Sequence, residues 1–229
     1  MRSAGCIVND IADKDFDRKV KRTKKRPIAA NLISVNKALI YSSLMCIIAF
    51  LILIQFNNLT IILGLGSMIL AFTYPFMKRI TYWPQLFLGI TFNWGIMMSW
   101  TASVGYISLD ILYFYLAAIF WTLGYDTIYG AQDINDDEII GVKSTSIKFK
   151  KYLKTFVSIN YFLASLILLI LFENRLGINY FTIFIIIFIL SLIYQTVVFD
   201  RASPRKCLAS FKLNNYSGFS LLLAMMFIK

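Results

Sequence analysis

The sequence lacks histidine altogether, and it has few charged residues and no paired cysteines. Without histidine, and with only Cys6, Cys46 and Cys207 at unpaired spacings, zinc ligation, an imidazole base and a Ser-His-Asp triad are excluded. Charged residues make up only 15% of the chain, whereas about a quarter is usual for a soluble domain. Hydrophobic residues make up 59% of the 229 positions, which indicates a membrane protein.

The hydrophobic residues are gathered into seven long stretches. A helix that crosses a bilayer needs roughly 20 mostly apolar residues, and backbone polar groups cannot stay unpaired in lipid, so such stretches must be helices. They do not show the period-two alternation of barrel strands. The sequence therefore predicts an all-α, polytopic transmembrane helix bundle. Its seven helices are expected at residues 38–56, 59–77, 85–104, 109–129, 152–172, 178–199 and 213–228.

The net charge of +11 comes from basic residues in alternate loops. Lysine and arginine are concentrated in residues 14–37, 78–79, 143–154 and 201–212, whereas the intervening loops hold only Arg175. By the positive-inside rule, the four basic loops face the cytoplasm and its anionic lipids. A nucleic-acid partner is disfavoured, because no basic segment interleaves aromatic residues in a soluble domain.

Nine of the 12 acidic residues lie in two clusters, and both clusters belong to the basic side of the predicted topology. On a helix that advances about 100° per residue, each cluster forms a stripe on one face. The first stripe contains Asn9, Asp10, Asp13 and Asp17, and Asp15 points elsewhere. If residues 125–137 are helical throughout, the second stripe contains Tyr125, Asp126, Tyr129, Asp133 and Asp137.

Carboxylates stacked in this way repel one another, most strongly near a bilayer. Magnesium is the natural partner, since it takes one or two carboxylates, keeps waters and completes its shell with substrate phosphates. Two facing stripes predict a diphosphate held through metal ions, whose charge stabilises the departing diphosphate while the allylic fragment becomes a carbocation. For a single cluster, a helix cap or a solvated face is the simpler interpretation. Solvation alone explains Asp15 and Glu138.

Two strings of residues carry a family resemblance. Asn9-Asp10-x-x-Asp13-x-x-x-Asp17 resembles the first aspartate-rich motif of the UbiA superfamily of intramembrane prenyltransferases, and Tyr125-Asp126-x-x-Tyr129-x-x-x-Asp133-x-x-x-Asp137 resembles its second. The likeness extends over essentially the whole chain, through residues 21–27, 74–79, 84–85, 141–145 and 214–218. The second motif and the Lys-Ser-Thr run after it look most like the 4-hydroxybenzoate polyprenyltransferases of ubiquinone synthesis.

The resemblance implies transfer of a polyprenyl chain from polyprenyl diphosphate to the ring carbon ortho to the hydroxyl of 4-hydroxybenzoate. It also implies Mg²⁺ as cofactor and the following site residues. One magnesium would be held by Asp10, Asp13 and Asp17, and the other by Asp126, Asp133 and Asp137. Lys78 and Arg79 would neutralise the diphosphate or the benzoate carboxylate, with Arg22, Arg26 and Lys143 as further candidates for the diphosphate. Asn9 would position the acceptor, and Tyr125 and Tyr129 would stabilise the cation through their ring faces.

Some of these residues keep a simpler interpretation. Arg22 and Arg26 also fit a role in membrane orientation, and the two tyrosines fit the aromatic belt of a membrane interface. Removal of the ring proton needs a base, for which a carboxylate is the available group in a chain without histidine.

Members of this superfamily generally have nine transmembrane helices, with the first motif at the end of the second helix. Only residues 1–8 precede that motif here. We therefore expect residues 1–229 to form a single UbiA-like domain without the first helix and most of the second. The expected location is a bacterial inner membrane, with the active site facing the cytoplasm. The alternatives are a haem or menaquinone prenyltransferase of the same type, a transporter with intramembrane carboxylates, or an inactive fragment.

Overall fold

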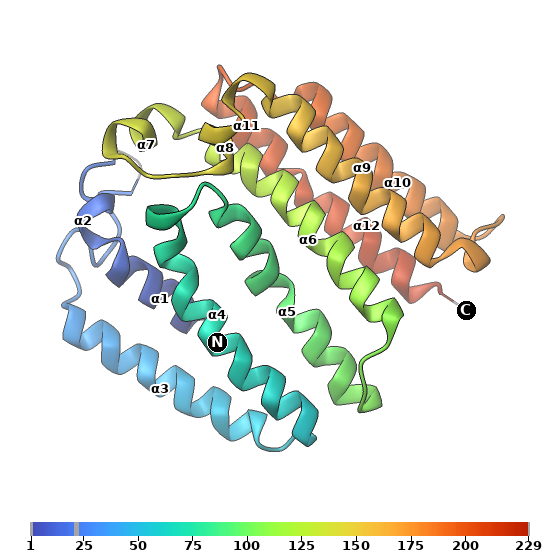
Figure 1. Ribbon diagram of the computed structural model, residues 1–229, viewed down its shortest axis with the longest axis horizontal. Coiled ribbons are helices and arrows are strands. Elements are labelled where there is room, and N and C mark those ends of the chain that lie inside the picture. The colour runs from blue at the N-terminus through green and yellow to red at the C-terminus, as the bar shows by residue number, and fades with distance from the viewer. Residues whose placement is uncertain (1, 21–22, 229) are drawn as a thin grey trace.

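A computed structural model describes residues 2–20 and 23–228, and all regular elements in this part of the chain are helices (Figure 1). The all-α prediction is confirmed. The elements are α1 (Arg2–Ala12), α2 (Lys14–Asp17), α3 (Val35–Leu53), α4 (Asn58–Ile80), α5 (Pro84–Val104), α6 (Leu109–Gly130), α7 (Ile134–Ile140), α8 (Thr145–Lys148), the 3₁₀ helix η1 (Lys150–Tyr152), α9 (Leu153–Leu171), the 3₁₀ helix η2 (Glu173–Arg175), α10 (Tyr180–Val198), α11 (Pro204–Lys212) and α12 (Asn214–Met226).

Polar side chains set the starts of the long helices. Each of these side chains accepts a hydrogen bond from the backbone N–H three residues later, which satisfies a donor that the first helical turn leaves unpaired. The residues that cap α3, α4, α6 and α10 in this way are Ser34, Asn57, Ser108 and Asn179. At the other end of α5, Gly105 has φ of 80°, a conformation that glycine adopts without steric cost.

Five helices in the described part of the chain are long and apolar enough to cross a membrane: α3, α4, α6, α9 with the turn before it, and α10. Helix α5 has 21 residues but carries polar side chains such as Gln85 and Asn93. Helix α12, which corresponds to the helix predicted over residues 213–228, has only 13 residues and follows α11 after Leu213. A helix lies at each of the seven predicted places, and the crossing of α5 and α12 stays a prediction.

The four basic loops lie at one end of the bundle. Figure 1 shows α2, α7, α8 and α11 at this end, together with the connection from α4 to α5. The backbone N–H of Lys143 donates to the carbonyl of Lys78 at 2.8 Å, which joins the segment after α7 to the last turns of α4. Both acidic motifs therefore come to the same end of the molecule.

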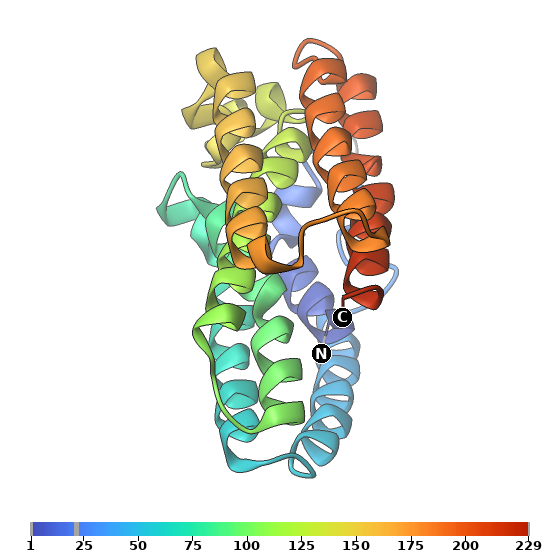
Figure 2. The same ribbon diagram turned by 90° about the vertical axis from the view of Figure 1, so that its right-hand side faces the viewer.

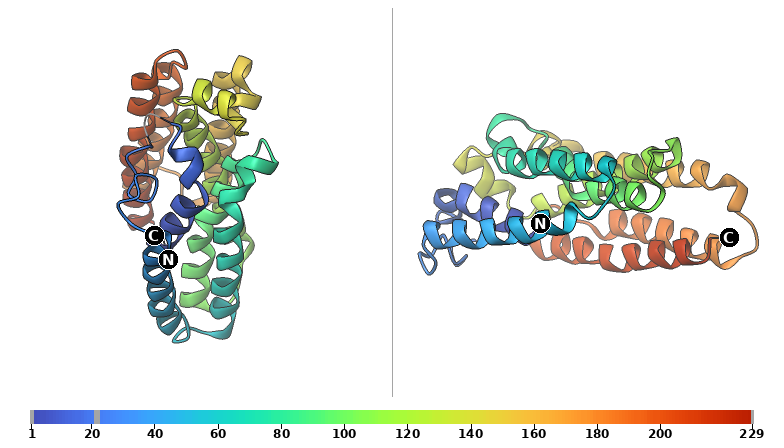
Figure 3. Two further views of the ribbon diagram at one scale, coloured as in Figure 1. Left: turned by 90° about the vertical axis from the view of Figure 1, so that its left-hand side faces the viewer. Right: turned by 90° about the horizontal axis from the view of Figure 1, so that it is seen from below.

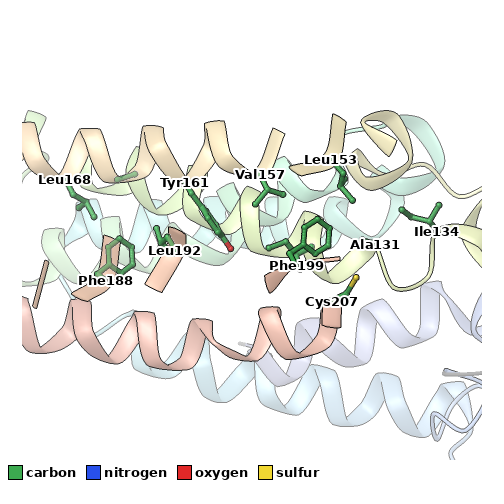
Figure 4. Close-up of a cluster of buried hydrophobic side chains, with 12 residues drawn as sticks. Ala131, Ile134, Leu153, Val157, Tyr161, Leu168, Phe188, Leu192, Phe199 and Cys207 are labelled. Atoms are coloured by element: carbon green, nitrogen blue, oxygen red, sulfur yellow. The ribbon is translucent and has the colours of Figure 1, made fainter. Parts of the chain in front are cut away.

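The main hydrophobic core lies between α6, α9 and α10 (Figure 4). It includes Val157 and Tyr161 from α9, and Phe188 and Leu192 from α10. Helices α10 and α12 run side by side (Figure 2). Tyr161 Oη donates to Gln195 Oε1 at 2.6 Å, so this buried hydroxyl is paired within the core.

Helix α1 lies at the edge of the bundle. Figure 3 shows it beside α3, away from the core of α6, α9 and α10. The hydroxyl of Ser42 in α3 donates to the carbonyl of Ala4 in α1 at 3.4 Å. The first acidic motif is thus carried by a peripheral helix, whereas the second lies at the end of a core helix.

Candidate active site

A cavity of about 210 Å³ opens at the end of the bundle where the basic loops meet. Its wall is formed by α1, α2, the last turns of α4 and α6, the start of α5, α7 and the segment after α7. Most of the predicted site residues line it: Asn9, Asp13, Asp17, Lys78, Asp126, Tyr129, Asp133, Asp137 and Lys143. Arg26 lines it as well. The structure therefore brings the two acidic motifs to one cavity.

The first motif keeps its helical spacing across a break between α1 and α2. Asp13 lies at the break, with φ of −95° and ψ of 0°. The backbone N–H of Asp13 still donates to the carbonyl of Asn9 at 2.9 Å, and that of Asp17 to the carbonyl of Asp13 at 2.8 Å. These three side chains consequently share one face toward the cavity. Asp15 faces solvent, with 86% of its side chain exposed, as predicted.

Basic side chains neutralise the first motif. Asp13 is only 2% exposed and its Oδ2 forms an ion pair with Lys78 Nζ. Arg26 Nη1 lies 3.0 Å from both Asp17 Oδ2 and Asp10 Oδ1. The second oxygen of Asp13, Oδ1, is buried and accepts no hydrogen bond from the described residues. An unpaired buried carboxylate oxygen is costly, which marks Oδ1 as a position suited to a ligand.

Asp10 supports this arrangement from outside the cavity wall. It does not line the cavity, and its carboxylate is bonded to Arg26 instead. Burial raises the pKa of Asp10, and the charge of Arg26 opposes that rise. Asp10, a predicted metal ligand, is thus paired with Arg26 and is not among the residues that line the cavity.

The second motif is not helical throughout. Helix α6 ends at Gly130, and α7 begins at Ile134. The intervening turn is held by the Asp133 N–H, which donates to the carbonyl of Gly130 at 3.3 Å, and helical bonding resumes with the Asp137 N–H to the carbonyl of Asp133 at 2.8 Å. Despite this break, Asp126, Asp133 and Asp137 all reach the cavity wall.

Buried polar residues brace the end of α6. Thr127 Oγ1 and Thr145 Oγ1 lie 2.7 Å apart, and Ser146 Oγ donates to the carbonyl of Thr127 at 2.7 Å. A Cβ atom at Gly130 would lie 2.7 Å from Ser146 Oγ, so only glycine fits there without displacing a neighbour. The segment after α7 is thereby fixed against α6, beside the second motif.

The structure places two further predicted site residues away from the cavity. The Arg79 guanidinium donates to the carbonyl of Ala12 and lies over the ring of Phe16 at 4.9 Å, because the last turn of α4 directs it toward α1 and α2. Tyr125 packs edge-on against Trp121 and Phe211, each at 5.9 Å, in the core. Arg22 lies outside the described residues.

Tyr74 and Gln85 also line the cavity, although sequence reasoning did not single them out. Gln85 is buried, and its Oε1 accepts a hydrogen bond from the Thr145 N–H at 2.9 Å. Both residues belong to strings that carried the family resemblance but were considered only as parts of a loop. In the sequence, a polar side chain next to a long apolar run was the signal that could have marked Tyr74 and Gln85 as site residues.

The cavity fits magnesium in the chemistry of its donors. Carboxylate oxygens are ligands that Mg²⁺ prefers, and the buried Oδ1 of Asp13 accepts no hydrogen bond from the described part of the chain. Among the described residues, no three acidic side chains come close enough to hold an ion by themselves. Water and substrate phosphate would therefore complete the shell of a bound magnesium ion, as is usual for this metal.

Comparisons with known proteins agree with this geometry. Residues 1–217 match the profile of the UbiA prenyltransferase family. The chain is 38% identical over 228 residues to the 4-hydroxybenzoate octaprenyltransferase of Pseudoalteromonas translucida (strain TAC 125), and the alignment covers 99% of this chain and 78% of that protein.

Two solved structures have a similar fold. The apo structure of a UbiA homologue from Aeropyrum pernix K1 superposes with a TM-score of 0.85 at 27% identity, covering 98% of this chain and 84% of that one. A UbiA homologue from Archaeoglobus fulgidus, solved with GPP and Mg²⁺, superposes with a TM-score of 0.68 at 16% identity, covering 98% of this chain and 82% of that one. At that lower identity the likeness shows the fold alone.

Proposed function

This chain belongs to the UbiA prenyltransferase family, and from that premise we propose that it transfers a polyprenyl chain from polyprenyl diphosphate to 4-hydroxybenzoate. The bond forms at the ring carbon ortho to the hydroxyl, and diphosphate is released. This is the prenylation reaction of ubiquinone biosynthesis. The observation that carries the proposal is that both acidic motifs line the same cavity, together with Arg26, Lys78 and Lys143. Residues 1–229 act as one UbiA-like domain.

The basic residues of the cavity bind the diphosphate. Lys78 is paired with Asp13, and a diphosphate oxygen offers its ammonium group a second anionic partner. Lys143 and Arg26 line the same cavity and neutralise the remaining charge. Magnesium, when bound, supplies positive charge that stabilises the departing diphosphate. Asp13, Asp17, Asp126, Asp133 and Asp137 are the residues that would hold it.

The acceptor ring lies in the same cavity. Asn9 offers an amide to position it, and Tyr129, whose ring also packs against Phe211 at 4.6 Å, lines the cavity and would stabilise a carbocation. The proton that leaves the substituted ring carbon goes to a carboxylate of the wall, since the chain contains no histidine.

The protein lies in a bacterial inner membrane with this cavity on the cytoplasmic side. The basic loops and the cavity are at one end of the bundle, and basic loops face the cytoplasm. A transporter is less well supported, because its intramembrane carboxylates are expected near the midplane of the bilayer. Here they lie at helix ends.

The test uses membranes that contain the protein and no other 4-hydroxybenzoate prenyltransferase. Labelled 4-hydroxybenzoate, a polyprenyl diphosphate and magnesium are added, and the lipid-soluble labelled product is measured. We expect prenylated 4-hydroxybenzoate, which should disappear when magnesium is chelated and return when it is restored. A product formed only with a haem or a naphthoate acceptor would overturn the substrate assignment.

A further inference from the structure

A second pocket opens at the same end of the bundle, between the start of α9 and the end of α10. It has a volume of about 530 Å³ and, within the described residues, shares no wall residue with the cavity of the two acidic motifs. Its charged wall residues are five basic and one acidic: Lys150, Lys151, Lys154, Lys206, Arg201 and Asp200. The pocket is therefore a concave and strongly basic surface that the prenyl transfer reaction does not use.

Hydrogen bonds to backbone carbonyls hold two of these cations in place. Lys154 Nζ donates to the carbonyl of Val197 at 3.3 Å, and the Arg201 guanidinium donates to the carbonyl of Lys150. The bonds join the start of α9 to the end of α10. A carbonyl carries no net charge, so both side chains keep a full positive charge at the pocket.

The acids near the pocket account for only part of its charge. Asp200 is paired with Lys206 at 3.3 Å, and Glu138 is paired with Lys150 at 2.8 Å. Lys151, Lys154 and Arg201 remain as the source of the net positive charge. The acids paired at the pocket do not neutralise this excess, so the pocket is complementary in charge to an anionic ligand.

An apolar strip on α10 descends from the pocket toward the other end of the bundle. Val197 lines the pocket, and Tyr194 and Leu190 follow it at helical spacing on one face. These three side chains are 69%, 57% and 57% exposed, respectively, on a helix that is apolar enough to cross a membrane. The surface thus combines a basic pocket at the membrane interface with a strip suited to an acyl chain.

We propose that this pocket binds the phosphate headgroup of an anionic phospholipid, whose acyl chain lies along Val197, Tyr194 and Leu190. Basic pockets between transmembrane helices recognise anionic headgroups, and each nearby lysine or arginine adds to the affinity. The lipid belongs to the leaflet on the side of the prenyl transfer cavity. It bridges the start of α9 and the end of α10.

The experiment titrates the purified protein in a neutral detergent with phosphatidylglycerol, phosphatidylcholine or inorganic phosphate, and counts bound molecules by native mass spectrometry. We expect phosphatidylglycerol to bind in preference to phosphatidylcholine. Replacement of Lys151 and Lys154 by glutamine should lower the affinity for phosphatidylglycerol by about fivefold per lysine.

The matched control is the double variant Lys24→Gln, Lys25→Gln, which removes the same charge from an exposed loop and should keep wild-type affinity. Equal unfolding temperatures in lipid-free detergent show that both double variants are folded. Arg201→Gln removes a cation from the α10 side of the pocket and should also lower the affinity for phosphatidylglycerol. The proposal is overturned if the two double variants lose affinity equally or if neither loses it. It is also overturned if inorganic phosphate binds as well as the lipid.

Discussion

The half of the bundle that contains α1 to α4 carries the first acidic motif, and the half that contains α6, α9 and α10 carries the second. The two halves differ in how many of their residues are buried. Eight residues of α6 are buried, against two of α3. The second motif begins on α6, which packs against the core of α9 and α10. The first motif lies on α1 and α2 at the edge of the bundle, beside α3. One side of the cavity therefore belongs to the main core, and the other lies on α1 and α2 at the edge of the bundle, where α1 packs on α3 and α4.

Polar contacts reach α1 and α2 from basic side chains. Lys78 pairs with Asp13, Arg79 bonds to the carbonyl of Ala12, and Arg26 bonds to Asp17. The comparison teaches that basic side chains contact the peripheral motif directly, whereas the second motif begins on a helix packed in the main core. Loss of a basic side chain should accordingly disturb α1 and α2 locally, whereas overpacking at α6 should lower the stability of the whole bundle.

The largest effect is expected for Lys78→Met. The substitution leaves the buried Asp13 carboxylate without its cation and removes the ammonium group that we propose as a ligand of the diphosphate, so prenyl transfer should fall by about 100-fold or more. Amide hydrogen exchange should rise in α1 and α2 but not in α6 and α9. Lys24→Met, in an exposed loop, should keep wild-type activity. Equal increases of exchange in both halves would contradict the comparison.

An intermediate effect is expected from a pair of glycine substitutions. A Cβ atom at Gly124 would lie 2.4 Å from the ring of Tyr161, so Gly124→Ala should destabilise the core half by about 1–3 kcal/mol. At Gly66 in α4, no atom counted among the described residues lies within 4 Å of that position, so Gly66→Ala should be neutral or stabilising by up to about 1 kcal/mol. Unfolding of both variants in detergent measures the difference. Equal destabilisation would contradict the difference in packing between these two positions.

The smallest effect is expected at Arg79. Its guanidinium ties α4 to the end of α1 without lining the cavity. Loss of one charged hydrogen bond in Arg79→Gln should lower prenyl transfer by about tenfold, and the unfolding temperature should stay unchanged. Arg79→Lys should recover part of the activity. If Arg79→Gln abolished diphosphate binding completely, Arg79 would be a direct ligand, and this account of α1 would be wrong.

The sequence was sufficient for the places of the seven predicted helices, which depend on local patterns, whereas Lys78 and Lys143 were named as site residues only through the family resemblance. Hydrophobic runs predicted where helices lie, and helical spacing predicted that Asp13 and Asp17 share a face while Asp15 does not. Spacing could not predict the break at Ala131–Asp133 in the second motif, which depends on the packing of the segment after α7. It also could not predict that Arg79 and Tyr125 turn away from the cavity. Their directions are set by contacts with Phe16 and Phe211, far away in the sequence.

The most direct test of the two-motif cavity is prenyl transfer by four single Asp→Asn variants in matched pairs. Asp13 and Asp137 line the cavity, whereas their neighbours Asp15 and Asp136 are exposed. With expression levels equalised, Asp13→Asn and Asp137→Asn should each lose about 100-fold or more in rate, and Asp15→Asn and Asp136→Asn should keep wild-type rates. Equal losses within either pair, or full activity in Asp13→Asn or Asp137→Asn, would contradict the account.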